Sequence, residues 1–464
     1  MGSIHTLHFA PSSARHGWLV GLGDVMARRR RAILGIQWFV IVAYAVLVTV
    51  PAFLPLPAQG STVLNNLTLF AQFAFWGIWW PGVILGTMLF GRVWCGVLCP
   101  EGALAEFASR HGLGKAIPRW LRWSGWPLFA FIATTVYGQL VSVYEYPKAA
   151  LLVLGGSTVA GMAVGFVYGQ GKRVWCRYLC PVSGVFALLA RIAPLHFRVD
   201  REGWQRHPGR TAAVDCAPLL DVKHMKGASQ CHACGRCSGH RDAVQLAARS
   251  PNREILSSSL RDVRTSEALL LVFGLLGVAV ATFQWTASPW FVAMKIAAAE
   301  WLLEREWFLL LQDNAPWWLL THYPEASDVF TWLDGLSILA YIGGGALALG
   351  STILISLLIA ARVAGRMDWR VLAMGLVPLA GLGVFLGLSM LTLTQLRAEG
   401  VMFSSLDGAR AALLALAIGW SGWLGLHLLF KGAENLLRAM VAAVFYAVPL
   451  VAVGSAWYLL FYTW

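Results

Sequence analysis

The sequence predicts an all-α polytopic membrane protein with about nine transmembrane helices and a small cytoplasmic ferredoxin-like segment. The mean hydropathy is +0.63. Hydrophobic residues make up 58% of the chain and charged residues 13%, whereas about a quarter of an ordinary soluble domain is charged. Apolar runs of about 20 residues recur, and each is long enough to cross a hydrocarbon layer of ~30 Å. The polar segment carries a cysteine pattern that is described below.

Hydropathy and charge together divide the chain into nine predicted spans. They lie at roughly 32–54, 67–90, 124–143, 149–169, 266–286, 336–361, 371–394, 409–430 and 439–462. Basic clusters fall in alternate loops, at Arg28–Arg31, Arg362–Arg370 and Lys431–Arg438. Because cytoplasmic loops are enriched in Lys and Arg, this pattern predicts a multi-pass protein of the bacterial inner membrane with a cytoplasmic N-terminus and a periplasmic C-terminus. The net charge of +13 is therefore assigned to topology and not to nucleic-acid binding.

Four regions follow from these spans. We expect a basic cytoplasmic N-terminus at 1–31, a four-helix membrane unit at 32–193, a cytoplasmic ferredoxin-like segment at 194–264, and a five-helix membrane unit at 265–464. The last unit contains an acidic, Trp-rich periplasmic segment at 287–333. Glu300, Glu304 and Glu306 alternate there with apolar residues, which predicts an amphipathic helix lying on the membrane surface. This helix could also serve as a docking surface for a periplasmic partner.

One sequence block occurs twice in the four-helix unit. Residues 91–100 read GRVWCGVLCP and residues 172–181 read KRVWCRYLCP, each directly after an apolar span. In each block two cysteines four residues apart share one helical face, and a proline follows the second. The two blocks form a parallel repeat that brings Cys95, Cys99, Cys176 and Cys180 together. We expect them to hold one [4Fe–4S] cluster at the cytoplasmic surface; mixed ligation with the other cysteines, or redox-active thiols without metal, are the alternatives.

The remaining cysteines lie in the polar segment. Residues 231–237 read CHACGRC, the three-cysteine run of a [4Fe–4S] ferredoxin loop. A ferredoxin usually supplies its fourth ligand at the position that Arg241 occupies here, so Cys216 is the expected fourth ligand. The predicted ligands of this second cluster are Cys216, Cys231, Cys234 and Cys237. A structural zinc site is the alternative, although zinc sites usually show two Cys-x₂-Cys pairs.

Basic side chains stand beside both cysteine sets. Arg92, Arg173, Arg177 and Arg236 are close in sequence to the predicted ligands. A positive charge at ~4 Å from an anionic cluster contributes about 4 kcal/mol at an effective dielectric near 20. These arginines are therefore expected to contact the clusters and raise their reduction potentials, while the positive-inside bias explains them equally well.

No dinucleotide fingerprint, phosphate loop or HExxH zinc motif is found in the sequence. His322 and His427 fall on opposite sides of the predicted membrane, which makes a haem between them an unfavourable alternative. The chain is therefore interpreted as an electron-transfer component rather than a stand-alone enzyme. Crossing the remaining membrane needs a relay, which a bound quinone, a flavin or a partner's haem could supply.

The motifs WCGVLCP, WCRYLCP and CHACGRC resemble those of the NapH/NosR-type membrane polyferredoxins, over roughly residues 30–250. The resemblance implies that all eight cysteines are redox ligands and that electrons pass between quinol or cytoplasmic donors and periplasmic redox enzymes. The chain departs from that family in its single truncated ferredoxin run and in about 200 further residues.

The run CGRCSGHRDAVQLAARSPN and the extra spans look more like the polyferredoxin component of bacterial ferrous-iron uptake systems. That second resemblance implies periplasmic iron-binding partners and an iron permease. Two other classes of function stay open on the sequence alone. One is a permease whose cysteines sense redox state, and the other is a zinc-stabilised assembly factor.

Overall fold

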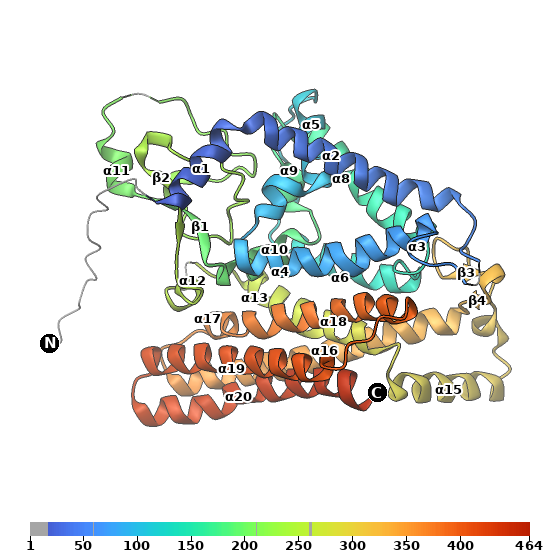
Figure 1. The fold of residues 1–464 in the computed structure, drawn as a ribbon. Helices are drawn as coiled ribbons and strands as arrows, with labels where there is room; N and C mark the ends of the chain where they lie inside the picture. Colours follow the sequence, from blue (N-terminus) through green and yellow to red (C-terminus); the bar gives the residue numbers. More distant parts are fainter. Residues whose placement is uncertain (1–16, 59, 210, 259–261) are drawn as a thin grey trace.

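The computed structural model describes residues 17–464 except 59, 210 and 259–261. Parts of two expected regions, 1–16 of the N-terminus and 210 and 259–261 of the ferredoxin-like segment, therefore lie outside the described residues. The described chain is mostly helical, as predicted, with two small two-stranded sheets. Figure 1 shows the N-terminal half as one layer of helices and α16–α20 as a second layer beneath it.

The first layer contains the two hairpins that the sequence predicts, together with short helices at their ends. Its α-helices are α1 (Trp18–Arg28), α2 (Arg30–Thr49), α3 (Leu67–Gln72), α4 (Trp80–Phe90), α5 (Pro100–Arg110), α6 (Trp126–Leu140), α7 (Pro147–Ala150), α8 (Gly156–Tyr168), α9 (Val174–Tyr178) and α10 (Ser183–Leu189). The π-helical segments Phe73–Trp79 and Leu151–Gly155 join α3 to α4 and α7 to α8.

The polar segment and the second layer complete the fold. Their α-helices are α11 (Arg201–Arg206), α12 (Arg253–Leu256), α13 (Thr265–Leu269), α14 (Val280–Gln284), α15 (Pro289–Glu304), α16 (Trp332–Ala364), α17 (Trp369–Met374), α18 (Val377–Ala398), α19 (Leu406–Gly432) and α20 (Leu436–Tyr458). The π-helical segment Leu270–Ala279 joins α13 to α14. The strands are β1 (Leu195–Val199), β2 (Val244–Ala248), β3 (His322–Tyr323) and β4 (Asp328–Val329).

Eight helices among the described residues are long and apolar enough to cross a membrane. They are Arg30–Phe53, Leu67–Phe90, Pro147–Tyr168, Thr265–Gln284, Trp332–Ala364, Val377–Ala398, Leu406–Gly432 and Leu436–Thr463. The predicted third span, 124–143, is shorter than expected: α6 covers only Trp126–Leu140, because residues 124–125 and 141–143 form turns at its two ends. A 15-residue helix is about 22 Å long, too short to cross the hydrocarbon layer unaided.

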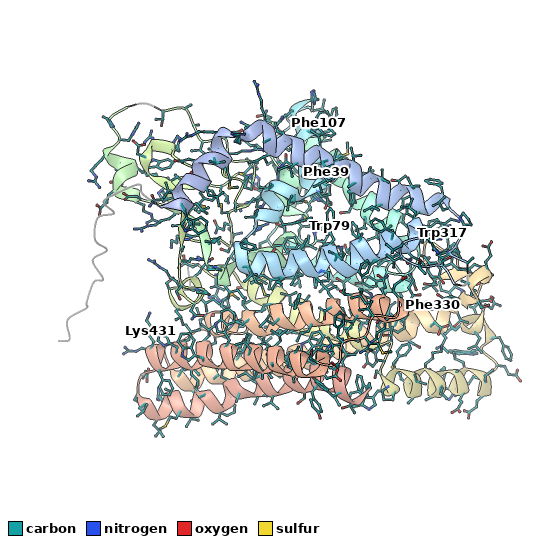
Figure 2. All side chains as sticks on the ribbon, viewed as in Figure 1. Phe39, Trp79, Phe107, Trp317, Phe330 and Lys431 are labelled. Atoms are coloured by element: carbon teal, nitrogen blue, oxygen red, sulfur yellow. The ribbon has the colours of Figure 1, made fainter. Side chains whose placement is uncertain are left out.

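The two ends of the bundle differ in composition. Lys431 marks one end, at the left of Figure 2, and Trp317 and Phe330 lie toward the other. Arg366 and Arg438 lie at the Lys431 end, where both contact Glu434 at 4.0 Å or less. We call this the basic end and the opposite one the Trp-rich end. The basic loops thus gather at one end, as the charge pattern predicts.

The expected surface helix lies in a different way from the prediction. α15 packs antiparallel to the start of α16: Phe291 contacts Tyr341, and Lys295 pairs with Asp334. Its exposed side chains include the apolar Trp290 as well as the acidic Glu300, so polar and apolar faces are not separated. The ion pair fixes the helix along α16, and it does not lie flat across the bundle.

The ferredoxin-like segment folds at the basic end. β1 pairs antiparallel with β2, with His196 opposite Ala247. α1 packs on β2, and a methyl group at Gly23 would lie 3.2 Å from the Cβ of Leu246. A small apolar core of Phe197, Val222, Met225 and Leu246 holds these pieces together. The N-terminal helix thus covers the polar segment before the chain enters the membrane unit.

Candidate metal centres

Four thiols line one cavity inside the first layer. The cavity measures about 80 Å³, and its walls include Cys95, Cys99, Cys176 and Cys180. Tyr44, Trp79 and Leu154 from three different spans form part of the apolar wall. The two sequence repeats therefore meet at one place, as the parallel arrangement predicts.

This cavity lies deeper than the predicted cytoplasmic surface. Tyr44 is in the middle of the Arg30–Phe53 span, and Ser157 lies about 15 Å along the helix from Tyr168 at the basic end. The reason is that both cysteine blocks turn back into the bundle. Each then continues as a short helix that runs toward the basic end, α5 after Cys99 and α10 after Cys180.

Contacts along α5 show this re-entrant course. The Glu101 carboxylate accepts a hydrogen bond from Ser157 Oγ at 2.6 Å, near the deep end of α8. Further on, a methyl group at Gly165 would lie 2.4 Å from Ala105 O. α5 and α8 therefore run parallel from the cavity to the basic end. In the second repeat, α10 packs against α4 in the same way, so each half-helix lies on the inward span of the other hairpin.

The helix starts favour an anionic group in the cavity. Cys99 is the N-cap of α5, and its Sγ accepts a hydrogen bond from Gly102 N at 3.3 Å. Pro100 occupies the first helical position, where a missing N–H costs nothing. The positive end of a helix dipole points at this thiol. The proline in the motif thus starts a half-helix whose first turn faces the metal position.

Gly102 leaves room where the thiols converge. A methyl group there would lie 3.3 Å from both Cys176 Sγ and the Arg173 guanidinium, and 3.6 Å from Cys99 Sγ. Arg173 is 1% exposed and also donates to the carbonyl of Cys95. One of the four predicted arginines therefore reaches directly into the first cysteine set.

The other four thiols line a second, smaller cavity. Its walls include Cys216, Cys231, Cys234 and Cys237, with Phe197 and Met225 behind them. Ala233 and Gly235 have φ of 48° and 74°, so the chain bends sharply between the cysteines. Ala233 N donates to Cys231 Sγ at 3.3 Å. The short Cys-x-x-Cys spacing wraps the backbone around this cavity, as a ferredoxin loop requires.

Arg241, at the position of the usual fourth ligand, is turned away from this cavity. Its Nε donates to Thr211 Oγ1 at 2.8 Å, and its guanidinium lies 5.4 Å from the ring centre of Trp204. Cys216 lines the cavity instead and comes from the loop before the ferredoxin run. A cysteine outside the usual run therefore completes the set of four.

The two cysteine sets touch through backbone. A methyl group at Gly96, in the first block, would lie 2.1 Å from His232 O and 2.8 Å from Cys234 N. Only glycine permits this approach, because any Cβ would overlap backbone atoms that cannot move aside. Gln37 Nε2 donates to Gly96 O at 3.1 Å and fixes the other side of the loop.

A buried carboxylate joins the two sets by charge. Glu106 is 3% exposed and accepts from Arg173 Nε at 2.9 Å and from Arg236 Nη2 at 2.7 Å. Arg110 Nη2 adds a third contact at 2.7 Å. Arg236 lies between Cys234 and Cys237 and lines the second cavity. Glu106 thus fixes one arginine from each cysteine set, a role that the sequence analysis did not identify.

The other two predicted arginines stand on a different side. Arg92 is 4% exposed and lines the first thiol cavity, where it donates to Ser183 Oγ at 2.7 Å and to Ser229 O at 3.1 Å. Arg177 lines a neighbouring cavity that Cys176 also borders. All four arginines thus lie near predicted ligands, in two groups with different partners.

The eight thiols form two sets of four metal-binding donors. All eight cysteines are free. Burial raises the pKa of Cys231 to about 12 and also raises that of Cys216, so these thiols need a bound cation to ionise. Among the described residues, no three His, Cys, Asp or Glu side chains are close enough to hold one metal ion. Four thiols around one cavity are the donor set that a [4Fe–4S] cluster uses.

Comparison with known proteins agrees with this chemistry. Residues 72–124 and 152–200, which contain both repeated blocks, match the sequence family described as 4Fe-4S binding domain. This part of the chain is similar to 4Fe-4S binding domains. Such a domain binds iron–sulfur clusters, and here it is built into a multi-pass membrane protein.

Relatives of this 4Fe-4S domain protein match over part of their length. Protein NirI of Paracoccus denitrificans is 32% identical over 34% of this chain and 26% of its own. Regulatory protein NosR of Pseudomonas aeruginosa is 26% identical over 34% of this chain and 25% of its own. The putative electron transport protein YccM of Escherichia coli is 23% identical over 26% of this chain and 40% of its own. The chain thus spans about a quarter to two fifths of the relatives' length, and no solved structure matches it.

Proposed function

We propose that the protein relays electrons between two [4Fe–4S] clusters, one at the cytoplasmic face and one within the membrane. Cys216, Cys231, Cys234 and Cys237 would hold the first, and Cys95, Cys99, Cys176 and Cys180 the second. The observation that carries the proposal is the contact between Gly96 and Cys234. Gly96 adjoins one predicted ligand and Cys234 is another, so a single backbone contact separates the two ligand sets.

Buried charge supports the same route. Two arginines beside anionic clusters stabilise the reduced state, and Glu106 forms an ion pair with both of them. Because both guanidinium groups pair with the same carboxylate, a change of charge on one cluster alters the electrostatic potential at the other. This coupling suits two centres that exchange electrons.

The depth of the second cluster shortens the route across the membrane. With the basic end in the cytoplasm, as the positive-inside rule requires, electrons entering at the ferredoxin-like segment would already be about 15 Å deep at the second cluster. They would continue toward the Trp-rich, periplasmic end, with the C-terminus on that side. A quinone or flavin is a candidate for the remaining step.

The partners follow from the family resemblance. A periplasmic redox or iron-binding protein would accept or supply electrons at the Trp-rich end, and an iron permease would use them when iron changes valence during uptake. Iron uptake is favoured by the five helices that extend beyond the 4Fe-4S domain, which the second resemblance shares. The protein itself would act in the inner membrane.

The direct test is the order in which the clusters are reduced. Purified protein is mixed anaerobically with dithionite, frozen at intervals and examined by EPR. We expect the membrane cluster to be reduced through the soluble one, so Cys216→Ser should slow its reduction at least tenfold while its iron is retained. Equal rates in the wild type and Cys216→Ser would contradict the relay.

A further inference from the structure

A further cavity borders the second cysteine block. It measures about 290 Å³ and is bordered by Cys176, by Ser229, Gln230 and His232 of the ferredoxin-like segment, and by the starts of α6, α10 and α13. It therefore borders Cys176 of the first cysteine set and residues next to Cys231 of the second. The relay as proposed above leaves this space unused.

Four guanidinium groups line this cavity. Arg92 and Arg177 lie at its inner wall beside Cys176, and Arg122 and Arg264 are exposed residues at its mouth. The one carboxylate in the lining is Glu267, which already accepts from Arg191 Nη2 at 2.6 Å. Like charges gathered in one space repel, so an anion bound between them would be strongly favoured.

Two buried polar atoms in the lining have no hydrogen-bond partner in the described part of the chain. They are Arg92 Nε and His232 Nδ1, on residues that are 4% and 3% exposed. A buried donor without a partner costs about 1–3 kcal/mol. Such atoms in the wall of a large cavity indicate that a polar ligand supplies the missing bonds.

The cavity also has an apolar side. Pro127, Gly184, Ala187 and Leu270, from three helical segments, also line the cavity, together with Trp123. These helical segments pack closely at Gly184, where an added methyl group would lie 2.6 Å from the Leu270 side chain and 2.8 Å from the Pro127 side chain. The cavity thus offers both guanidinium groups and apolar side chains to one ligand.

We propose that this cavity binds a phosphate-bearing ligand, with the phosphate between the four guanidinium groups and any apolar part against α6, α10 and the Leu270 segment. Arginine is the side chain that holds phosphate oxygens in pairs. Basic cavities between membrane helices bind lipid headgroups by the same chemistry. The ligand is either an anionic phospholipid or a soluble phosphate compound, which share this headgroup.

A consequence rests on the proposed function. Because Cys176 borders the cavity, a bound phosphate would place negative charge beside the membrane cluster and shield it from Arg92 and Arg177. The oxidised cluster would then be favoured, so its reduction potential would fall on binding. Binding itself is measured without reference to the clusters, which keeps the two claims separate.

The experiment compares wild type with Arg122→Gln/Arg264→Gln, two residues that lie outside both thiol cavities. The matched control is Arg119→Gln/Arg362→Gln, which removes two exposed arginines away from the cavity. Detergent-purified protein is examined by native mass spectrometry with phosphatidylglycerol or phosphatidylcholine added. The same proteins are titrated with inorganic phosphate by calorimetry after delipidation. Unchanged visible spectra and melting temperatures show that each variant is folded.

If the ligand is a lipid, the wild type should retain phosphatidylglycerol in preference to phosphatidylcholine. This binding should be about tenfold or more weaker in Arg122→Gln/Arg264→Gln, the mouth variant, and unchanged in the control. Saturable phosphate binding that the mouth variant loses identifies a soluble phosphate compound. The proposal would be overturned if all three proteins bound each probe equally well, or if none of the three proteins bound either probe.

Discussion

Gly96 and Cys234 meet backbone to backbone, although one lies in a re-entrant membrane loop and the other in the ferredoxin-like segment. The position of a Cβ at Gly96 is only 2.8 Å from the Cys234 amide nitrogen. This contact joins the two halves of the proposed relay, and the first prediction concerns it.

Gly96→Ala should separate the two cysteine sets. The added methyl group meets backbone atoms, so the ferredoxin loop has to move, at a cost of about 1–3 kcal/mol for an overpacked contact. We expect weaker magnetic interaction between the two reduced clusters in EPR and a lower free energy of unfolding. Gly86→Ala is the control, because nothing lies within 4 Å of its added methyl group. Unaltered EPR line shapes in Gly96→Ala would refute this view of the contact.

Glu106→Gln should destabilise both cluster sites together. The change leaves the buried Arg173 and Arg236 guanidinium groups without their shared carboxylate, and loss of one partner in a buried ion pair costs about 3–5 kcal/mol. We expect iron content to fall for both clusters and the melting temperature to drop. The exposed Glu300→Gln in α15 provides the comparison. Loss of one cluster with full retention of the other would argue against a shared role for Glu106.

Cys216→Ser should remove the soluble cluster, and Arg241→Cys should not restore it. Arg241 points to Thr211 and Trp204 rather than into the thiol cavity, so a cysteine there would be misplaced. Iron per chain is expected to fall from about eight to about four in both the single and the double variant. Recovery of eight iron atoms in the double variant would show that the loop binds its cluster in the usual ferredoxin manner.

The ferredoxin-like segment should lose stability in mild acid. Burial, aided by the charge of Arg249, lowers the pKa of His196 from 6.5 to about 4. Between pH 6.5 and 4 the imidazole is therefore protonated in the unfolded chain but neutral in the folded segment. The free energy of unfolding is unaffected above pH 6.5 and falls by up to about 3 kcal/mol as the pH decreases toward 4. Denaturant titrations followed by cluster absorbance measure it. The decline should be shallower in His196→Gln than in wild type, and identical slopes would exclude His196 as the cause.

The sequence was sufficient for the spans and the cysteine sets because both depend on local patterns. Apolar runs report membrane helices directly, and the repeat of WCxxxCP made the meeting of Cys95, Cys99, Cys176 and Cys180 predictable. That Cys216 takes the ligand role usually filled at the position of Arg241 could also be predicted, because arginine is not a cluster ligand. Each of these inferences needs only residue type and spacing.

The depth of the first cavity and the role of Glu106 could not be predicted from residue type and spacing. The proline after each block reads equally as the end of one helix or the start of another, and only the packing of α5 along α8 distinguishes them. Glu106 is a single carboxylate whose arginine partners come from residues 173 and 236, far away in the sequence. The orientation of α15 likewise depends on one ion pair, Lys295 with Asp334.

The most direct test of the whole account is iron, sulfide and zinc analysis of the anaerobically purified protein together with Mössbauer spectroscopy. Two separate thiol cavities predict about eight iron and eight sulfide per chain, all in [4Fe–4S] clusters, with Cys95→Ser and Cys216→Ser each retaining about half. Protein that is folded but free of iron, or that contains zinc in place of iron, would contradict it.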